Sequence, residues 1–524
     1  MTRHLGLDFG TTSTVVASID DQGEPHVLAV PRFSVKSQDP KHETHGVPSV
    51  IHFNSHDEYH IGGEVLQHNQ LNSPSTFRWM KSTIVENLHD SPRILDDTSN
   101  MTTYEAARTF IKTLVTGVES NYGEINTLCF TLPVHSFNNY QEWLLETALE
   151  CGVKAPVFID EATAAAVGYS KNLKIGDKFM VVDFGGGTLD ISIVQVKKTE
   201  RESAHKISVL GISGTSLGGR DIDGWVLQRA VREFGGGIES ISESATANDL
   251  LLNCERAKER LSFEESTTID LFEPKTGSVR QITLSRSQFE ELLDSFGMFD
   301  KIEDCLRSAL NQARNNGLDE SEIKTVLLVG GSTLIPSVKQ HFSRRFGAKR
   351  VETDQPFSAV AIGAARIAAG QTIDNRIFHE YSIRYLNEDG VEKFEPIVAP
   401  GQEFPVERLW SREVTSTRAG QRKFTIDIHQ RDVVNIDSDE QAEIVFSDTG
   451  FAKFLSRAKK KQSVRMQKLS SKTIFADSST HAGQPCLSIR LDIDAHRRLL
   501  ITVRDIRSIP NEVLLENSPL SYMR

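Results

Sequence analysis

Two short segments of this chain each place an aspartate at the end of an apolar strand, directly before a turn of glycine and threonine. The first segment is residues 5–13, LGLDFGTTS, and the second is residues 180–190, MVVDFGGGTLD. Glycines let the backbone N–H groups of a turn approach a polyphosphate closely, and concave arrays of N–H groups bind anions. Threonine hydroxyls add hydrogen bonds, and a carboxylate at the strand end can hold Mg²⁺ through water. The two turns therefore predict a phosphate-binding site.

The segments that leave the turns separate this pattern from other phosphate-binding motifs. Residues 13–17 and 191–194 are β-branched and apolar, so both turns lead into strands. A P-loop or a dinucleotide fingerprint would instead open a helix, and neither pattern occurs here. One such turn alone is more often an ordinary turn, given the turn preferences of Asp, Gly and Thr. Two of them between apolar strands predict a duplicated domain that holds one nucleotide from both sides.

Three further segments extend the pattern. Residues 326–333, VLLVGGST, predict a buried strand that enters a glycine turn, with a helix from Pro336. Residues 160–166 open a helix, and residues 254–258 lie within another. In this order the motifs resemble the actin-like ATPase superfamily, and within it the heat-shock protein 70 chaperone family, from about residue 5 to residue 369. The resemblance implies an α/β fold with a duplicated actin-like ATPase domain.

The resemblance also implies roles for individual residues. Lys81 would contact the transferred phosphate, and Asp183 and Asp190 would orient the attacking water. Such a site works by positioning and by electrostatic stabilisation of the phosphoryl oxygens. The catalytic residues that the resemblance implies are Lys81, Asp183, Glu161, Asp8, Asp190 and Thr188. The implied contacts to ATP or ADP are Gly10, Thr11, Thr12, Gly185, Gly186, Gly187, Gly218, Gly219, Glu255, Lys258, Ser262, Gly330, Gly331 and Ser332. Mg²⁺ would be held by Asp8, Glu161 and Asp183, mostly through water, and K⁺ is a further candidate ion.

Each of these residues also has a simpler interpretation. Lys81 taken alone would be a solvated surface lysine, because lysine is seldom buried. Glu255 and Lys258 stand three apart on a helix and could form an ordinary surface ion pair. Asp183 and Asp190 flank a glycine turn and could be capping residues.

Several positions depart from the family pattern. Glu259 and Leu334 stand where family members have arginines on the adenine faces, so cation–π stabilisation is lost. Phe357 replaces the usual aspartate after the proline that precedes the last helix. Base selectivity is therefore left open, whereas phosphate chemistry is expected.

Composition sets the broad class. A chain of 524 residues exceeds one core, and 25% charged with 38% hydrophobic residues is typical of a soluble protein. The net charge of −12 argues against nucleic-acid or anionic-membrane binding. Five scattered cysteines favour reduced thiols, and residues 1–4 lead directly into a strand, so we expect no signal peptide and a cytoplasmic location.

The expected domains are an ATPase domain at 1–370, a polar linker at 371–379 and a β-sandwich at 380–524. Residues 487–505 resemble the peptide-binding β-sandwich of the family, and a helical lid is expected to be absent because the sequence ends at Arg524. Apolar residues alternate with polar ones in this region, which predicts half-buried antiparallel strands. The alternating apolar residues are Phe424, Ile426, Ile428, Leu487, Ile489, Leu491, Ile493, Leu499, Ile501 and Val503.

Coupling between the two domains is expected to be weak. The family's proline switch position is retained as Pro133, but Glu142 stands where its arginine relay is found. The polar linker replaces a leucine-rich acidic one. Nucleotide is therefore expected to change peptide affinity less than in the family at large.

Two other patterns have weaker functional interpretations. His52, His56 and His60 stand four apart, but the surrounding residues predict strand and turn, which would scatter a metal site. The basic segment 457–461, with Arg465 and Lys468, is typical of a solvated surface; an anionic partner is the alternative.

The sequence thus predicts an ATP-binding, slowly hydrolysing chaperone-like protein whose β-domain binds polypeptide, with a J-domain cochaperone and a nucleotide-exchange factor as expected partners. One alternative is a nucleotide-gated scaffold or sensor with a single fixed partner. A small-molecule kinase of the same superfold is the other.

Overall fold

The chain forms two compact units in the computed structural model. Unit 1 comprises Met1–Ile373 and Glu440–Ala458, and unit 2 comprises Asp374–Asp439 and Lys459–Arg524. The predicted domain boundaries stay a prediction, but the sequence did not anticipate that residues 440–458 belong with unit 1. The structure describes residues 3–37, 44–86, 92–96, 99–134, 138–153, 156–169, 174–198, 205–235, 244–273, 277–353, 355–371, 376–377, 380–386, 391–399, 402–434, 441–457, 463–475, 481–494, 498–507 and 513–522.

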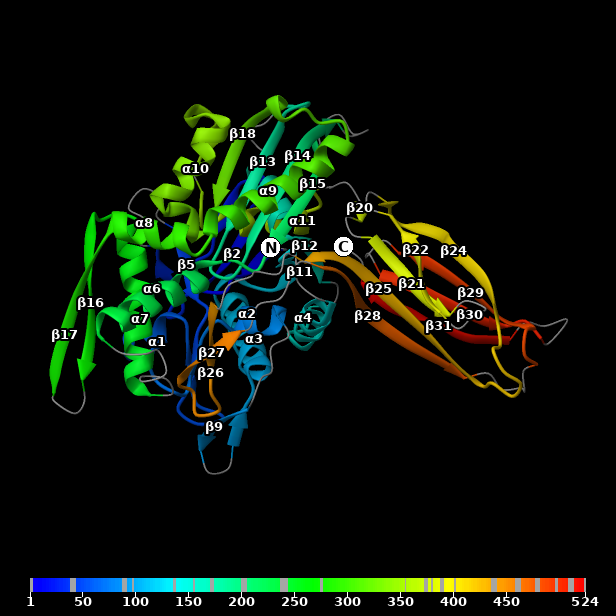
Figure 1. Cartoon of the computed structure of the whole chain (residues 1–524), viewed down its shortest axis with the longest axis horizontal. Coiled ribbons are helices and arrows are strands. Elements are labelled where there is room, and N and C mark those ends of the chain that lie inside the picture. The colour runs from blue at the N-terminus through cyan, green and yellow to red at the C-terminus, as the bar shows by residue number, and fades with distance from the viewer. Residues whose placement is uncertain are drawn as a thin grey trace. The chain divides into compact units, whose positions relative to one another are not determined.

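Lobe I of unit 1 is built on a seven-stranded sheet with the order β12-β11-β1-β2-β5-β4, and β3 pairs with β2 (Figure 1). β1 and β2 form an antiparallel hairpin, whereas β1, β11 and β12 run parallel. The elements of this lobe are β1 (Arg3–Phe9), β2 (Ser13–Ile19), β3 (Pro25–Val27), β4 (Val35–Lys36), β5 (His45–Pro48), β6 (Ile51–Phe53), β7 (Tyr59–Ile61), α1 (Gly63–Gln67), β8 (Thr76–Phe77), α2 (Met80–Val85), β9 (Arg93–Asp96), β10 (Ser99–Met101), α3 (Thr103–Tyr122), β11 (Ile125–Leu132), α4 (Asn138–Glu150) and β12 (Val157–Asp160).

Lobe II repeats the same strand directions. Its five-stranded sheet has the order β15-β14-β13-β18-β19, with β13 and β14 antiparallel and β13, β18 and β19 parallel. Helices α8 and α9 are separated at Gly297, which adopts φ 67°. The elements are β13 (Lys178–Phe184), β14 (Leu189–Lys198), β15 (His205–Thr215), α6 (Gly219–Glu233), α7 (Ala245–Leu261), β16 (Ser266–Glu273), β17 (Ser278–Ser285), α8 (Arg286–Ser295), α9 (Met298–Asn315), η3 (Glu320–Glu322), β18 (Ile323–Val329), η4 (Gly331–Leu334), α10 (Pro336–Phe346), η5 (Ala348–Arg350) and β19 (Val351–Glu352).

Two helices rich in alanine and glycine join the lobes. α5 (Glu161–Tyr169) packs against β13 and β14, and α11 (Ala359–Ala368) packs against β1 and β2. A β-carbon at Gly363 of α11 would overlap the backbone of Ala164 on α5, so the two helices approach closely only because glycine stands there. This packing brings the N-terminus of α5, with Glu161, toward both sheets.

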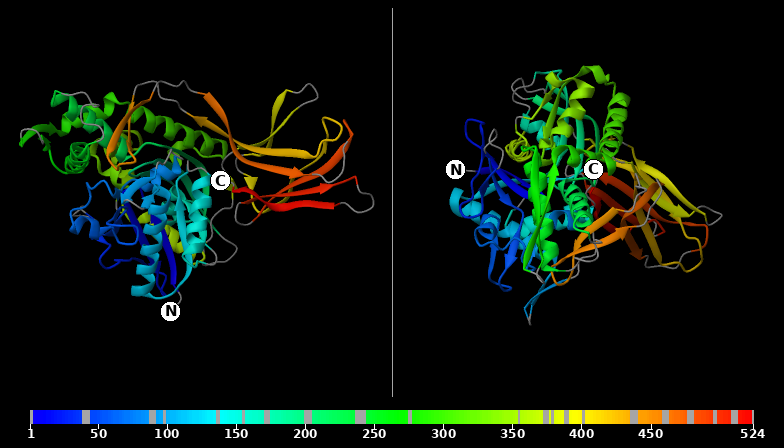
Figure 2. Two further views of the ribbon diagram at one scale, coloured as in Figure 1. Left: turned by 90° about the horizontal axis from the view of Figure 1, so that it is seen from below. Right: turned by 60° about the vertical axis from the view of Figure 1, so that its left-hand side comes forward.

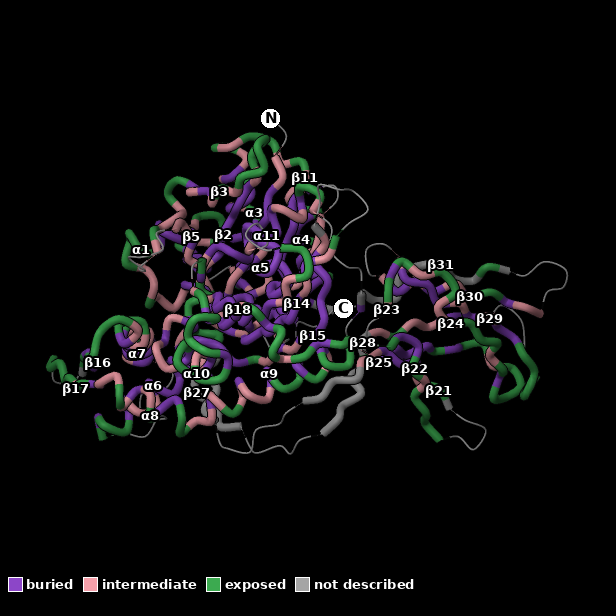
Figure 3. Tube along the Cα trace, turned by 90° about the horizontal axis from the view of Figure 1, so that it is seen from above, coloured by how far each residue is buried: buried purple, intermediate pink, exposed green. Residues whose placement is uncertain are grey.

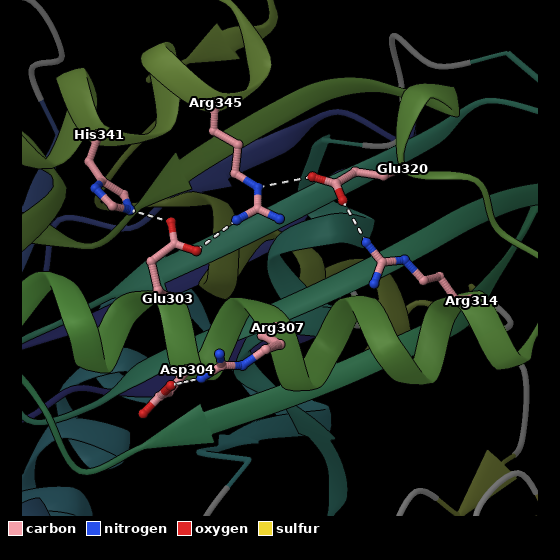
Figure 4. Close-up of polar contacts among 7 residues, drawn as sticks. All are labelled: Glu303, Asp304, Arg307, Arg314, Glu320, His341 and Arg345. Carbon is pink, nitrogen blue, oxygen red and sulfur yellow. Dashed lines mark hydrogen bonds and ion pairs between the residues drawn. The ribbon is translucent and has the colours of Figure 1, made fainter.

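Each lobe has its own hydrophobic core. The core of lobe I gathers side chains from β1, β2, α3 and α4, and the core of lobe II gathers side chains from β13, β14 and α6–α10. In Figure 3 buried residues concentrate along the strands of these sheets. At the surface of lobe II, Glu303 on α9 pairs with His341 and Arg345 on α10, at 2.8 and 2.7 Å (Figure 4). These partly exposed pairs add little stability each.

Unit 2 contains two four-stranded antiparallel sheets, β22-β21-β25-β28 and β24-β29-β30-β31, whose apolar residues form one core. All ten alternating apolar residues predicted from the sequence belong to that core. The polar face is less exposed than predicted, because Asp427 is 2% exposed and pairs with Arg384 and Lys468. The elements are β20 (Arg376–Ile377), β21 (Glu380–Leu386), β22 (Glu392–Val398), β23 (Gln402–Glu403), β24 (Val406–Thr415), β25 (Lys423–Val434), β28 (Ser463–Phe475), β29 (Pro485–Ile493), β30 (Arg498–Asp505) and β31 (Val513–Tyr522).

Two predicted segments fall partly outside the described residues. They are the linker, at residues 372–375 and 378–379, and the basic segment, at residues 458–461. Residues 376–377 of that linker form β20, and Ile377 is buried in the core of unit 2. Across the described part of the chain, no helix is long and apolar enough to cross a membrane.

Candidate functional site

The first predicted turn lies between β1 and β2, as expected. Asp8 is at the end of β1, and its Oδ1 accepts a hydrogen bond of 2.8 Å from the hydroxyl of Thr131. Thr131 is near the end of β11, which runs parallel to β1 and therefore ends at the same sheet edge. On the other side of the turn, the hydroxyl of Ser49 donates to the carbonyl of Gly10 at 2.7 Å. The turn is thus held from two neighbouring elements.

The second turn lies between β13 and β14, also as expected. The N–H of Gly185 donates to the carbonyl of Thr188 at 3.0 Å and closes the turn. The antiparallel register places Asp183 directly opposite Asp190. Asp190 Oδ1 accepts from the N–H of Val134 at 3.1 Å, whereas its Oδ2 is buried and has no protein hydrogen bond among the described residues. The second turn therefore has two facing carboxyl groups.

The two turns lie against each other. A β-carbon added at Gly186 would lie 2.9 Å from Thr12 Cγ2, and one added at Gly187 would lie 2.6 Å from Thr11 Oγ1 and 2.5 Å from Ser82 Oγ. Any residue larger than glycine at position 187 would require the side chains of Thr11 and Ser82, or the turn itself, to shift. The prediction of two turns that flank a common site therefore agrees with their positions in the fold.

Lys81 is buried at this junction. It lies on α2, is 5% exposed, and forms an ion pair with Glu161 at the N-terminus of α5. The surface-lysine interpretation is therefore wrong. Burial by itself would lower the pKa of Lys81, but the attraction of neighbouring anions, Glu161 foremost, outweighs burial and raises the pKa above its ordinary value. The ammonium group is charged at any physiological pH.

Four buried carboxyl groups surround this lysine. They belong to Asp8, Glu161, Asp183 and Asp190. Removal from water raises the pKa of each, to about 7 for Glu161 and to about 8 for Asp190. Repulsion from Glu161 adds to burial at Asp183 and Asp190. With one lysine for four acids, the site favours additional positive charge.

A hydrated divalent cation fits this set of donors better than a directly ligated one. Among the described residues, no group of three or more His, Cys, Asp and Glu side chains is placed to hold a metal ion. The carboxyl groups are nevertheless close enough to influence each other's pKa. Mg²⁺ retains several waters and is often held through one or two carboxylates and substrate phosphates. Asp8, Glu161 and Asp183 would hold it in this way.

The predicted ATP or ADP contacts outside the two turns lie on lobe II. Ser332 donates from its hydroxyl to the carbonyl of Gly185 at 2.8 Å, and Lys258 Nζ donates to the carbonyl of Gly219 at 3.2 Å. A β-carbon at Gly330 would lie 2.8 Å from Asp183 Oδ1, and one at Gly219 would lie 3.3 Å from Ser332 Oγ. Gly218 directly precedes α6, and Ser262 is one turn beyond Lys258, at the end of α7. Gly218, Gly219, Gly330 and Ser332 therefore border the second turn.

Glu255 and Lys258 do not pair with each other. Lys258 Nζ lies 2.8 Å from Asp223 Oδ1 on α6, and Glu255 pairs with Arg78, which lies two residues before α2 of lobe I. The interpretation of Glu255 and Lys258 as an ion pair on the surface of one helix is therefore wrong. The departures from the family pattern also lie here: burial raises the pKa of Glu259, and a β-carbon at Gly331 would lie 3.4 Å from Phe357 Cε1.

Sequence reasoning missed four residues that shape the site: Thr131, Ser82, Arg78 and Asp223. Ser82 follows Lys81 directly, and Thr131 ends a strand, so both could have been noticed from their neighbours. Asp223 and Arg78 have no such signal, because their partners are distant in the sequence. The three histidines are also placed: His52 on β6 faces His60 on β7, His56 lies in the intervening turn, and the strand-and-turn prediction is confirmed.

Comparison with known families agrees with this geometry. A model of the Hsp70 protein family matches residues 4–432, which include all of the site residues above. The chain belongs to the Hsp70 family, whose members have the actin-like ATPase fold, bind ATP or ADP with Mg²⁺, and act as chaperones.

Proposed function

We propose that unit 1 binds Mg²⁺·ATP between its two turns and hydrolyses it slowly, and that unit 2 binds polypeptide as a β-sandwich. The observation that carries the first half is the contact between the two glycine turns around the buried Lys81–Glu161 pair. The strand directions shared by the two lobes support a duplicated domain. The two sheets of unit 2 around one core support the β-sandwich.

The chemical role of the lysine follows from its charge and position. Lys81 is the cation that the described residues bring to both turns, and it would stabilise negative charge that builds on the phosphoryl oxygens. Bound Mg²⁺ supplies further charge neutralisation and orients the phosphates. Thr11, Thr12 and Thr188 offer hydroxyl donors to the same oxygens, and the glycine N–H groups bind the remaining ones.

The facing aspartates would handle the attacking water. Asp190 Oδ2 has no protein hydrogen bond in the described residues and therefore can bind a water. Asp183 lies opposite on β13. Two adjacent carboxyl groups titrate as a pair, so one can carry a proton while the other accepts one. This arrangement allows the pair to orient water and to take its proton.

Nucleotide binding is tested by thermal melting of the whole chain with and without Mg²⁺·ATP or Mg²⁺·ADP. Any ligand that prefers the native state raises the melting temperature by mass action. We expect a shift at millimolar nucleotide, followed by slow release of phosphate. No shift and no phosphate release would contradict the proposal for unit 1.

Polypeptide binding needs a separate experiment. We propose to capture proteins from a lysate with the whole chain, with and without ATP, and to titrate a labelled extended peptide. Binding of many unfolded peptides would support the chaperone function. One tight native partner would favour a nucleotide-gated scaffold. We expect less than a tenfold difference in peptide affinity between ATP and ADP, about 1.4 kcal/mol of coupling.

A further inference from the structure

A β-hairpin encoded within the β-strand region of the chain belongs to unit 1. β26 (Gln441–Phe446) and β27 (Ala452–Arg457) pair along their full length. In sequence they stand between β25 and β28, two paired strands of unit 2. The hairpin, orange in Figures 1 and 2, lies beside the green helices α6 and α7 and the blue strand β9. The protein thus places part of its C-terminal region on the nucleotide-binding unit.

The hairpin is built into lobe II. Ile444 and Ala452 are 8% and 0% exposed and belong to the hydrophobic core of that lobe. A β-carbon at Gly224 of α6 would lie 3.4 Å from Ile444 Cδ1. Asn248 on α7 is buried, and its side chain accepts from the N–H of Ala452 at 2.8 Å and donates to the carbonyl of Gly450 at 3.4 Å. One amide side chain therefore satisfies two backbone groups of the hairpin.

The same hairpin also contacts lobe I. The ring of Phe446 lies 5.7 Å from the ring of Trp79, and the guanidinium of Arg93 lies 4.9 Å from the Phe446 ring. The N–H of Ile94 on β9 donates to the carbonyl of Asp448 at 3.3 Å. A β-carbon at Gly450 would overlap the carbonyl of Pro74. The hairpin therefore bridges the two lobes.

The contacts of the hairpin lie next to direct contacts between the two lobes. Asn72 of lobe I pairs with Asp249 of α7, and the side chain of Asn248 donates to the carbonyl of Asn72 at 3.2 Å. Asn248 precedes Glu255 by two turns of α7, about 10 Å along the helix axis. On the lobe I side, Trp79 is the residue before α2, the helix of Lys81. The bridged region is therefore next to the proposed nucleotide site.

We propose that the β26–β27 hairpin is an intramolecular clamp that holds the two lobes together and limits nucleotide entry and release. The hairpin itself covers the surface that α6, α7, Trp79 and Arg93 form. The inference rests on the proposed nucleotide site between the lobes.

The ion pairs of Glu255 and Lys258, two of the predicted ATP or ADP contacts, support a clamp that has to open before nucleotide can bind. Glu255 is engaged by Arg78 of the opposite lobe, and Lys258 is engaged by Asp223. A nucleoside that contacts Glu255 has to replace Arg78, which requires the lobes to separate locally. Because the hairpin contacts both lobes, such separation detaches it from one of them. Hairpin release then precedes nucleotide exchange, and the clamped state reduces the fraction of binding-competent protein.

The experiment uses the whole chain with three changes that weaken the clamp. In one variant a flexible Gly-Ser linker replaces residues 441–457. Phe446→Ala removes the ring contacts of the hairpin with lobe I. Asn248→Ala removes the two hydrogen bonds from α7 to the hairpin together with the one to Asn72. Thr449→Ala, at the exposed tip of the hairpin, is the matched control. Release and association of a fluorescent ADP with Mg²⁺ are measured by stopped flow. Hydrogen exchange of the nucleotide-free protein is measured over α2 and α7.

We expect the linker variant to release ADP at least about tenfold faster than the parent, equivalent to about 1.4 kcal/mol of clamping, and to bind it faster as well. The two point variants should show smaller increases of both rates, and Thr449→Ala none. Backbone exchange should rise in α2 and the first turns of α7 but not in β13.

The outcomes separate the clamp from the nucleotide site. Nucleotide binding with unchanged rates in the linker variant and both point variants would overturn the clamp alone. Absence of nucleotide binding in the parent would overturn the proposed function and the clamp with it. If the linker variant fails to fold, equal rates in both point variants and in Thr449→Ala still overturn the clamp.

Discussion

The two glycine turns share the same strand arrangement but differ in the residues that lie opposite their aspartates. Each turn joins two antiparallel strands, and the first of these strands is apolar and also pairs with a parallel strand. In the first, Asp8 lies opposite Val15, and its carboxyl group accepts a hydrogen bond from Thr131. In the second, Asp183 lies opposite Asp190.

This difference suits the two turns to different chemical roles. A single carboxyl group with a hydroxyl donor is suited to holding charge in one place. Burial and then repulsion from Glu161 raise the pKa of both facing carboxyl groups, and repulsion from Asp190 raises that of Asp183 further. We infer that the first turn mainly binds the hydrated cation and that the second turn mainly acts on the attacking water.

The largest expected effect comes from the lysine that serves both turns. Lys81→Ala should lower the single-turnover rate of ATP hydrolysis by about 100-fold or more, because charge on the phosphoryl group is then stabilised less. The fold should survive, since Glu161 can remain protonated when its partner is lost. Circular dichroism checks the fold, and Lys81→Arg is the charge-retaining control. Hydrolysis at the parental rate in Lys81→Ala would remove the lysine from the catalytic set.

The division of work is tested by the same change in each turn. Asp183→Asn should lower kcat by roughly 100-fold with little effect on nucleotide affinity, because water is oriented poorly. Asp8→Asn should mainly weaken the dependence on Mg²⁺, which a titration of activity against Mg²⁺ concentration measures. Equal losses of kcat in the two variants, with unchanged Mg²⁺ dependence, would erase the distinction between the turns.

Contact between the turns is tested with two alanine substitutions in the second turn. A β-carbon at Gly187 would lie within 2.6 Å of Ser82 and Thr11, whereas the nearest atom to one at Gly185 is 3.8 Å away. Gly187→Ala should therefore push the turns apart and weaken Mg²⁺·ADP binding by about tenfold, and Gly185→Ala should bind almost normally. Calorimetric titration compares the two. Similar affinities would mean that the turns need not touch to bind nucleotide.

The smallest effect is a pH dependence of stability that belongs to the second turn. Burial raises the pKa of Asp190 to about 8 in the folded state, above the ordinary value of 3.8. Between these values the folded state binds more protons than the unfolded state, so the free energy of unfolding falls as pH rises. Urea unfolding of the nucleotide-free protein from pH 5 to pH 8 measures this slope.

The isosteric variant isolates the contribution of Asp190. Asp190→Asn cannot ionise, so it should gain stability over the parent as pH rises, by at most about 1.4 kcal/mol per pH unit. Asp8→Asn should change the slope less, since Lys81 and Thr131 lower the pKa of Asp8 in opposition to burial. An unchanged slope in Asp190→Asn would mean that its carboxyl group is ionised in the folded protein.

Much of the local structure could be predicted from the sequence. The strand–turn–strand segments, the helix from Pro336 and the alternating strands of unit 2 all occur where expected. Glycine, proline and hydrophobic period act over a few residues, so a short window contains the necessary information. Predictions became less accurate where polar residues were judged by neighbours in the sequence. Asp427 alternates with apolar residues in a strand that was predicted to be half-buried, but it is 2% exposed and pairs with Arg384 and Lys468.

The sequence by itself determined the two turns and the buried strands beside them, and through the family pattern it gave the roles that we propose for the lysine and the acids. Only the tertiary structure decided which charged groups meet: Lys81 with Glu161, Arg78 with Glu255, and the hairpin 441–457 with α7. The physical reason is the distance along the chain over which each effect acts. Backbone preference and hydrophobic period are local, whereas an ion pair between residues far apart in the chain exists only after both lobes have packed.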